Sequence, residues 1–258
     1  MPVLTEHRLR IGSREITLLH GPAGWGEFDE EAIERLVGST SAGTLPVEQY
    51  RSLAATLHRA QGERQLKSVI VTSPSPGDGK SHVAVNLALT LSASYRRRVL
   101  LIDADLRRPT LHLLFQVPNA RGLNETLKEK ADEKVAAVQI SDTLTLLPAG
   151  RSEPDPLGGL SSDRMRRIVA DAATRFDWVI VDSPPVGILA DAHLVSETVD
   201  AAILVVRAGV TRFPDLKAAA DALGHERILG VVLNGVDPLE IRGEGYYSHY
   251  YGSDRDKR

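Results

Sequence analysis

The chain has no cysteine and no long apolar run, and each absence narrows what kind of protein this is. With 0 Cys among 258 residues there is neither a disulfide framework nor a cysteine metal site, as expected in a reducing compartment. No stretch approaches the roughly 20 apolar residues that a membrane-spanning helix needs. Residues 1–10 also lack the apolar core of a signal peptide. The sequence therefore predicts a cytoplasmic protein.

The chain also lacks a large excess of positive or negative charge. The formal net charge of −3 argues against sequence-independent binding of nucleic acid over the whole surface. The hydrophobic content of 42% and the charged content of 25% are ordinary for a globular protein. A length of 258 residues suits one α/β domain with an N-terminal extension.

The order of strand-like and helix-like stretches predicts an α/β fold with a mostly parallel central sheet flanked by helices. Near-continuous Val/Ile/Leu strands indicate that both faces of the sheet are covered. Gly62 is expected to stop the first helix. Residues 109–160 contain Asn, Gly and Pro breaks and are harder to assign. The expected strands are 68–72, 99–103, 144–147, 178–182, 202–206 and 229–234, and the expected helices are 47–61, 80–94, 162–175, 190–197 and 215–223.

Three regions follow from this pattern. Residues 1–45 form an N-terminal extension and linker, with a short strand expected over 15–19 and a short helix over 30–37. Residues 46–236 form the α/β domain. Residues 237–258 have no apolar periodicity and are predicted to be a flexible, tyrosine-rich tail.

A turn rich in glycine and proline, Ser73–Ser81, follows the first strand and opens the next helix. In such a loop, backbone N–H groups and the helix N-terminus surround phosphate oxygens. Lys80 is expected to reach the β- and γ-phosphates, and the Ser81 hydroxyl to bind Mg²⁺. The strict pattern has glycine where this chain has Pro74, but the strand–loop–helix context supports the motif over a chance Gly-Lys-Ser turn. The residues expected to contact the nucleotide here are Pro76, Gly77, Asp78, Gly79, Lys80, Ser81 and His82.

Acidic side chains follow two other expected strands. Asp103 and Asp105 end one, Asp182 ends another, and ligands of parallel sheets bind at these carboxyl ends. One carboxylate suits Mg²⁺, and a second can accept a proton from an attacking hydroxyl. Taken singly, each is equally well a turn former or a helix cap. Asp191, which begins an apolar helical run, is interpreted as an N-cap.

Two arginines, Arg107 and Arg108, follow Asp105 directly. They are expected either to contact phosphate oxygens or to pair with acids.

In this order the motifs resemble those of the bacterial tyrosine kinases of capsule and exopolysaccharide synthesis, which share the P-loop ATPase fold of the MinD/ParA group. The resemblance runs from about Pro46 to Asn234. MinD/ParA proteins carry a further lysine early in the loop, and its absence from residues 73–77 favours the kinase branch. The matching residues are Pro76–Ser81 for Walker A, Asp103, Asp105 and Arg107 for Walker A′, and Asp182, Pro184 and Pro185 for Walker B.

The resemblance implies a P-loop NTPase fold, with ATP and Mg²⁺ as cofactors. It assigns catalysis to Lys80, Asp103, Asp105 and Asp182, and the metal to Ser81, Asp103 and Asp182. It also implies that Arg107 and Asn234 contact the nucleotide, Asn234 near the adenine.

The tail holds four of the six tyrosines: Tyr246, Tyr247, Tyr250 and Tyr251. Members of the family end in such a cluster, which a neighbouring subunit phosphorylates in trans. A flexible tail can bring a phenol in line with the γ-phosphate. The alternative is an adhesive aromatic tail or a strand-pairing segment.

The resemblance also implies partners. A separate membrane-spanning polysaccharide co-polymerase is expected to activate the chain and to hold it peripherally at the inner face of the membrane. Homo-oligomers are expected through Glu48 and Arg51 of a Glu-x-x-Arg-x-x-Arg motif, although Ala54 replaces its second arginine. The alternative is an ordinary amphipathic helix with an intrahelical Glu48–Arg51 pair. Nucleic acid is not expected as a partner.

Two rival functions stay open from the sequence. One is a MinD/ParA-like ATPase switch without phosphotransfer to protein, and the other is an ATP-binding scaffold. Phosphotransfer to tyrosine separates the kinase from both, and ATP hydrolysis without it separates the switch from the scaffold.

Overall fold

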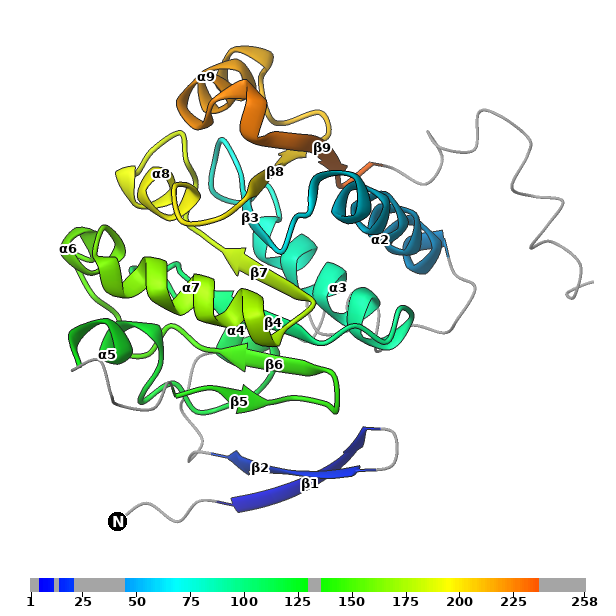
Figure 1. Ribbon diagram of the computed structural model, residues 1–258, viewed down its shortest axis with the longest axis vertical. Coiled ribbons are helices and arrows are strands. Elements are labelled where there is room, and N and C mark those ends of the chain that lie inside the picture. Colours follow the sequence, from blue (N-terminus) through cyan, green and yellow to red (C-terminus); the bar gives the residue numbers. More distant parts are fainter. Residues whose placement is uncertain (1–4, 12–13, 21–44, 130–135, 237–258) are drawn as a thin grey trace, which may run out of the picture.

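The computed structural model describes residues 5–11, 14–20, 45–129 and 136–236 (Figure 1). Strands β1 (Thr5–Ile11) and β2 (Arg14–His20) pair antiparallel, which confirms the strand expected over 15–19. The helix expected over 30–37 and the tyrosine tail lie outside the described residues.

The domain is built on a seven-stranded sheet with the order β5-β6-β4-β7-β3-β8-β9. Every neighbouring pair is parallel except β5–β6, which is antiparallel at one edge. All six expected strands are confirmed, four of them with the predicted ends. The bounds are β3 Ser68–Thr72, β4 Val99–Asp103, β5 Val138–Gln139, β6 Leu144–Leu147, β7 Trp178–Asp182, β8 Ala201–Arg207 and β9 Ile228–Asn234.

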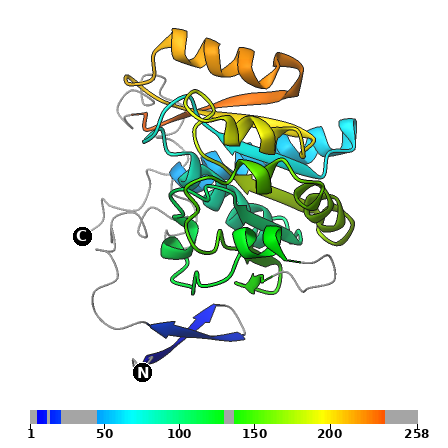
Figure 2. The ribbon, with the colours of Figure 1, turned by 90° about the vertical axis from the view of Figure 1, so that its left-hand side faces the viewer.

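Helices cover both faces of the sheet, as the apolar strands predict (Figures 1 and 2). Alternate residues of one strand point to opposite faces, so that Ile70 packs with one core cluster while Val69 and Val71 pack with the other. One face carries α2 (Leu45–Arg64), α3 (Lys80–Ala93) and α4 (Leu111–Leu114). The other carries α5 (Leu123–Lys128), α6 (Leu157–Leu160), α7 (Asp163–Arg175), α8 (Ala190–Ser196) and α9 (Phe213–Leu223).

The expected end of the first helix is wrong. Helix α2 continues past Gly62 to Arg64, and the first left-handed backbone is at Gln65, with φ 59°. A side chain at position 62 would meet nothing within 4 Å, so that glycine lies on an open face of the helix. Glycine ends a helix where the backbone turns left-handed, and here that turn falls three residues later.

Residues 109–160, in which the sequence predicts only the strand at 144–147, contain short elements within their described part: α4, α5, α6, β5 and β6. Glu125 on α5 accepts the N–H of Gly122 at 2.9 Å, so that side chain, rather than apolar periodicity, defines where the helix begins. Elements of two to six residues are too short to give a periodic signal.

The parallel strands bring their carboxyl ends to one edge of the sheet, and this edge holds the predicted site. Asp103 and Asp182 lie opposite one another in register on neighbouring strands β4 and β7. Strand β3, which leads into the glycine-rich loop, is the next strand along. Three of the predicted motifs therefore meet at adjacent strand ends.

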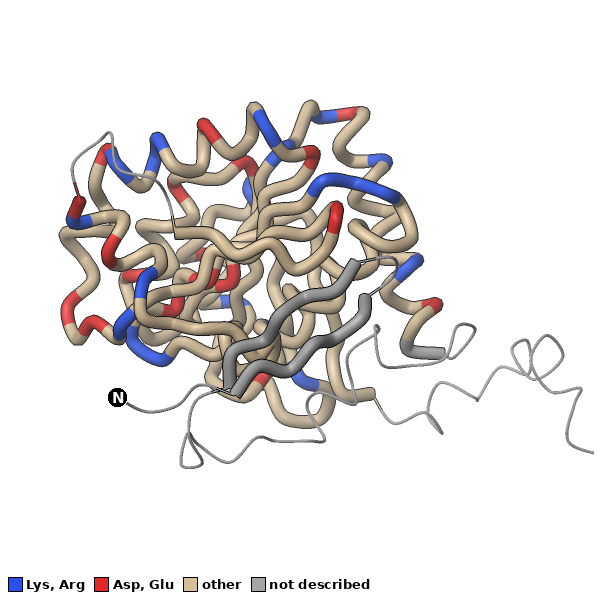
Figure 3. The backbone as a smooth tube through the Cα atoms, turned by 90° about the horizontal axis from the view of Figure 1, so that it is seen from below, with Lys and Arg blue, Asp and Glu red and all other residues tan. Residues whose placement is uncertain are grey.

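Basic and acidic residues alternate around the outside of the described chain, with neither sign gathered over a whole face (Figure 3). This distribution agrees with the small net charge of −3. In the described residues, no helix has both the length and the apolar character needed to cross a membrane.

Candidate nucleotide-binding and phosphotransfer site

The loop between β3 and α3 has the backbone that phosphate binding requires. Gly77 and Gly79 both have left-handed backbones, with φ 84° and 94°. Position 74 has no such requirement, which explains why proline is accepted where the strict pattern has glycine. A Cβ on Gly79 would also lie 2.0 Å from the Asn234 side-chain nitrogen. Helix α3 starts at Lys80, so its free N–H groups face the loop.

Asp78 shapes this loop from within. Its carboxylate accepts the N–H of Ser75 at 3.0 Å and the hydroxyl of Thr211 at 2.8 Å. The side-chain amide of Asn234 donates to the Asp78 carbonyl at 2.9 Å. Asp78 is 2% exposed, so its side chain contacts only other parts of the protein. Any contact it makes with a nucleotide therefore comes from its backbone.

Thr211 is a residue that the sequence analysis missed. It lies between β8 and α9, and besides holding Asp78 it accepts the N–H of Arg207 at 2.7 Å. Nothing in the local sequence marks a threonine in a turn as a support for a loop more than 130 residues earlier. Asn234 lies beside the glycine-rich loop, which brings the end of the last strand to the site as expected.

The segment after β7 packs against the loop from the other side. The Val186 N–H donates to the Ser73 carbonyl at 3.0 Å, and the Thr72 hydroxyl donates to the Pro184 carbonyl at 2.9 Å. Gly187 approaches so closely that an added Cβ would lie 2.4 Å from the Pro74 carbonyl oxygen. The backbone of residues 183–187 therefore supports the position of the phosphate loop.

We expect Gly187→Ala to weaken ATP binding by about tenfold or more, because the new methyl group pushes backbone against backbone. The measurement is the ATP dissociation constant by titration calorimetry. Gly158→Ala is the matched control, since a Cβ there meets nothing within 4 Å. Equal affinity in the two variants would show that the loop shifts without cost.

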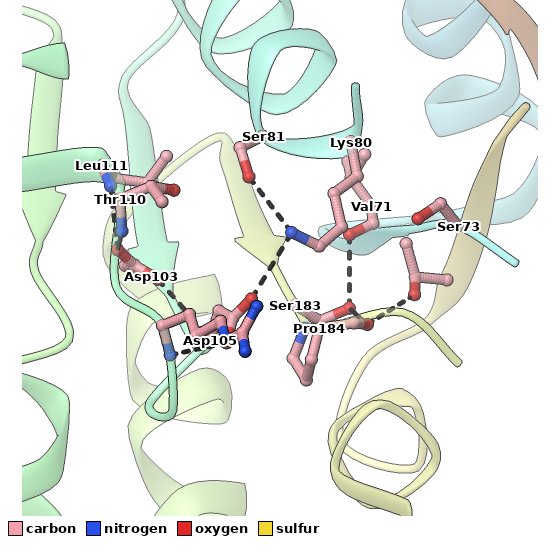
Figure 4. Close-up of polar contacts among 12 residues, drawn as sticks. Val71, Ser73, Lys80, Ser81, Asp103, Asp105, Thr110, Leu111, Ser183 and Pro184 are labelled. Atoms are coloured by element: carbon pink, nitrogen blue, oxygen red, sulfur yellow. Dashed lines mark hydrogen bonds and ion pairs between the residues drawn. The ribbon is translucent and has the colours of Figure 1, made fainter. Parts of the chain in front are cut away.

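Lys80 lies among acidic side chains (Figure 4). Its ammonium nitrogen is 3.4 Å from Asp105 Oδ2 and 3.3 Å from the Ser81 hydroxyl. Asp103 is fully buried and accepts the N–H groups of Thr110 at 3.2 Å and Leu111 at 3.0 Å. The catalytic residues expected from the sequence are thus brought together at one place.

Burial, together with the charge of neighbouring acids, raises the pKa values of Asp103 and Asp182. Burial, followed by the charge of Asp182, raises the pKa of Asp103 to about 8, against the hydrogen bonds from Leu111 and Thr110. Burial raises the pKa of Asp182 to about 6, although Lys80 and the Ser81 hydroxyl oppose the rise. The cluster therefore holds more negative charge than Lys80 offsets, and a further cation would be favourable there.

The side chains fit a magnesium–nucleotide complex. Both carboxylate oxygens of Asp182 are buried without a partner at hydrogen-bond distance, although the Ser81 hydroxyl lies close enough to lower the pKa of Asp182, and they are available to a cation or to its water ligands. In the described part of the chain, no three His, Asp or Glu side chains form a metal cage of their own. An ion here would depend on Ser81 and on the phosphates, as Mg²⁺ does in phosphate-loop proteins.

Arg107 and Asp191 form an ion pair at the edge of this cluster. Arg107 Nε donates to Asp191 Oδ2 at 2.7 Å and Nη2 donates to Oδ1 at 3.2 Å. The interpretation of Asp191 as an N-cap is wrong, because Leu189 occupies the cap position and Asp191 lies in the first turn of α8. The alternative that these arginines pair with acids holds for Arg107.

The remaining predicted residues that the structure describes lie in the phosphate loop, at the start of α3 and on α2. Pro76 is exposed in the loop, and His82 lies half-buried in the first turn of α3. On α2, Arg51 pairs with Glu48 at 2.5 Å, while Ala54 is fully buried in the core. The position of the missing arginine therefore faces the core in this chain. The four tail tyrosines lie outside the described residues.

Comparison with known proteins agrees with this geometry. Residues 66–234 match the family model of the cellulose biosynthesis protein BcsQ. A tyrosine-protein kinase of Bacillus subtilis, YwqD, is 37% identical over 82% of this chain and 90% of its own length. The chain belongs to the bacterial tyrosine-protein kinases. A putative member from Staphylococcus aureus, CapB, is 29% identical over 80% of this chain and 90% of its own.

Solved structures show the same relationship. The kinase domain of the Escherichia coli tyrosine kinase ETK superposes with a TM-score of 0.69 at 33% identity, covering 74% of this chain and 76% of that one. A ParA family ATPase of Chlorobium tepidum, with a TM-score of 0.54 at 22% identity over 67% of this chain and 75% of its own, shares the fold alone. The predicted P-loop fold and family are therefore confirmed.

Proposed function

We propose that this kinase is an autokinase that uses Mg²⁺ and ATP to phosphorylate Tyr246, Tyr247, Tyr250 and Tyr251 of a neighbouring copy. The observation that carries the proposal is the cluster of Lys80 with three buried or nearly buried carboxylates, Asp103, Asp105 and Asp182, beside a phosphate loop. A binding scaffold has no need of two buried acids, Asp103 and Asp182, whose pKa values are raised by burial and by neighbouring charge.

Each side chain has a role in transfer. Lys80 and the N-terminal N–H groups of α3 bind and orient the phosphates and offset the charge that develops on them. Asp103 accepts the phenolic proton as the tyrosine oxygen bonds to the γ-phosphorus and the bond to the bridging oxygen breaks, which leaves ADP. Because burial and the charge of Asp182 raise its pKa to about 8, Asp103 accepts the proton in its ionised form, and the transfer rate should increase as pH rises toward 8.

Ser81 and Asp182 are the residues that would hold Mg²⁺, which when bound neutralises phosphate charge. Asp105 keeps Lys80 in place through their 3.4 Å contact. The proposed roles of Gly77 and Gly79 are to form the phosphate loop. Asn234, which donates to the Asp78 carbonyl, is proposed to close the loop beside the adenine. Arg107 is not required as a phosphate ligand in this assignment.

The proposal extends to organisation and setting. We take residues 46–236 as the kinase domain, residues 1–45 as an extension that contacts the activator, and residues 237–258 as the substrate tail. Elements α2 and β9, which begin at Leu45 and end at Asn234, support these limits. The activator is a separate membrane-spanning co-polymerase that holds the kinase at the inner face of the membrane, in service of capsule or exopolysaccharide synthesis. Glu48 and Arg51, both partly exposed on α2, contribute to contact between copies.

The test is phosphosite mass spectrometry on the full chain with Mg²⁺ and ATP, alone and co-expressed with its genomic neighbours. We expect phosphate on the tail tyrosines, and none in a variant with all four replaced by phenylalanine. ATP turnover with unmodified tyrosines in both preparations would contradict the autokinase and favour an ATPase switch. Binding without turnover would favour a scaffold.

A further inference from the structure

The Arg107–Asp191 pair connects two segments that each carry part of the site. Asp191 belongs to α8, which follows the β7 segment that supports the phosphate loop. Arg107 belongs to the segment after β4, which carries Asp103 and Asp105. The two residues are 84 positions apart in sequence, so their contact exists only in the folded domain.

The geometry of the pair is that of a fixed clamp. Two parallel hydrogen bonds join the guanidinium to the carboxylate, an arrangement that fixes orientation as well as distance. The Asp191 side chain is 1% exposed, while that of Arg107 is 29% exposed. A carboxylate this deeply buried is retained only because it is paired.

The clamp has a third attachment. Arg107 Nη1 also donates to the Pro154 carbonyl, and the Ser152 hydroxyl donates to the Arg107 carbonyl at 2.9 Å. Arg107 is thus held by two separate segments of chain, α8 and residues 152–154, and none of these contacts is to the acidic cluster. Its guanidinium is occupied by protein groups.

What the clamp positions is the short segment between β4 and α4. Two residues before Arg107, Asp105 contacts Lys80 at 3.4 Å and accepts the N–H of Arg108 at 3.1 Å. At the other end of the segment, the Thr110 and Leu111 N–H groups donate to Asp103. The whole segment therefore surrounds the two carboxylates and is anchored at its middle by Arg107.

We propose that Asp191 is a positioning residue for phosphotransfer: through Arg107 it fixes residues 104–110, and with them the carboxylates of Asp103 and Asp105, relative to Lys80. The proposal rests on the proposed kinase function. Asp191 touches neither nucleotide nor tyrosine in this role. A displacement of about 1 Å at reacting groups is enough to slow an enzyme substantially, so a positioning residue affects rate more than substrate binding.

The first test is the split between kcat and KM. In Asp191→Asn we expect kcat for tail phosphorylation to fall by about tenfold or more, while KM for ATP stays within about threefold, since the phosphate loop is intact. Arg107→Lys keeps the charge but loses the two-pronged geometry, so an intermediate loss of kcat is expected. Unchanged kcat beside an active wild-type chain would overturn the proposal, whereas an inactive wild type would instead contradict the proposed function.

The second test needs no activity. Hydrogen exchange in the nucleotide-free protein should show the amides of residues 105–111 opening about tenfold faster in Asp191→Asn, with the β3 and β7 amides unchanged. Uniformly faster exchange would mean that Asp191 supports only overall stability, against the proposal. The double variant Arg107→Met/Asp191→Asn should be no slower in phosphotransfer than the more damaged single variant, and additive losses would show that the two residues act separately.

Discussion

In Lys80→Met, tail phosphorylation is expected to fall by at least about 10²–10³-fold, the loss found when a charge-stabilising group is removed from a water-excluded site. The ammonium lies 3.4 Å from Asp105 and lowers the pKa of Asp182, so its loss leaves three acids with less positive charge among them. Methionine retains the length of the side chain and supplies no charge. The measurement is the initial rate of phosphotyrosine formation under Mg²⁺ and ATP.

Lys67→Met is the matched control, because Lys67 is exposed and precedes β3 at the opposite edge of the sheet.

The Lys80→Met variant also distinguishes transfer between copies from transfer within one chain. Lys80→Met, which keeps its tyrosines, is mixed with a chain that has an intact site and four phenylalanines in its tail. Phosphate on the Lys80→Met chain is expected. Its absence, with wild type active, would show that each site modifies its own tail.

Asp103→Asn is expected to act in opposite directions on activity and on stability. Loss of the proton acceptor should reduce phosphotransfer by about 10²–10⁴-fold. The folded protein should nevertheless become more stable at neutral pH. In wild type the fold must keep a proton on the buried carboxyl that the unfolded chain releases, and asparagine removes this cost. Burial together with Asp182 raises its pKa in the fold to about 8, whereas an unfolded chain leaves it near 3.8.

The sign follows from proton linkage. Below pH 4 the carboxyl is protonated in both states, and its contribution to stability is fully present. As pH rises toward 8 the unfolded state releases this proton and the fold does not, so the free energy of unfolding declines. Asp103→Asn should therefore unfold at a temperature several degrees higher than wild type at pH 7.5, a gain of up to about 5 kcal/mol, and at an equal temperature near pH 4.

Thermal unfolding of the nucleotide-free protein at the two pH values measures this effect. Asp171→Asn, on the exposed side of α7, is the control and should show no such dependence. A lower unfolding temperature for Asp103→Asn at pH 7.5 would mean that the Thr110 and Leu111 hydrogen bonds outweigh the cost of burying the charge.

Features that depend on residues close together in the sequence could be predicted from it. The ends of β3, β4 and β7 are predictable to the residue because each is an uninterrupted apolar run, buried at every position, that stops at a turn or an acid. The meeting of Asp103 with Asp182 is predictable as well, since parallel strands align their carboxyl ends. The phosphate loop is predictable from the glycines of its sequence.

The features that escape prediction depend on contacts between distant segments. Asp78 reads as a nucleotide contact, yet Thr211 and Ser75 occupy its carboxylate. Asp191 reads as a cap because its partner, Arg107, comes 84 positions earlier. Strand β5, with two residues and an antiparallel partner, is too short to carry a period.

The contact of Asn234 with the phosphate loop sets a length limit on the reaction. The tail leaves the sheet at the active-site edge, and Tyr246 follows Val236 by ten positions. A chain of that length spans at most about 35 Å even when fully extended. Transfer between copies therefore requires the two active-site edges to approach within roughly that distance. Assemblies that keep those edges farther apart leave Tyr246 out of reach, whatever the concentration of ATP.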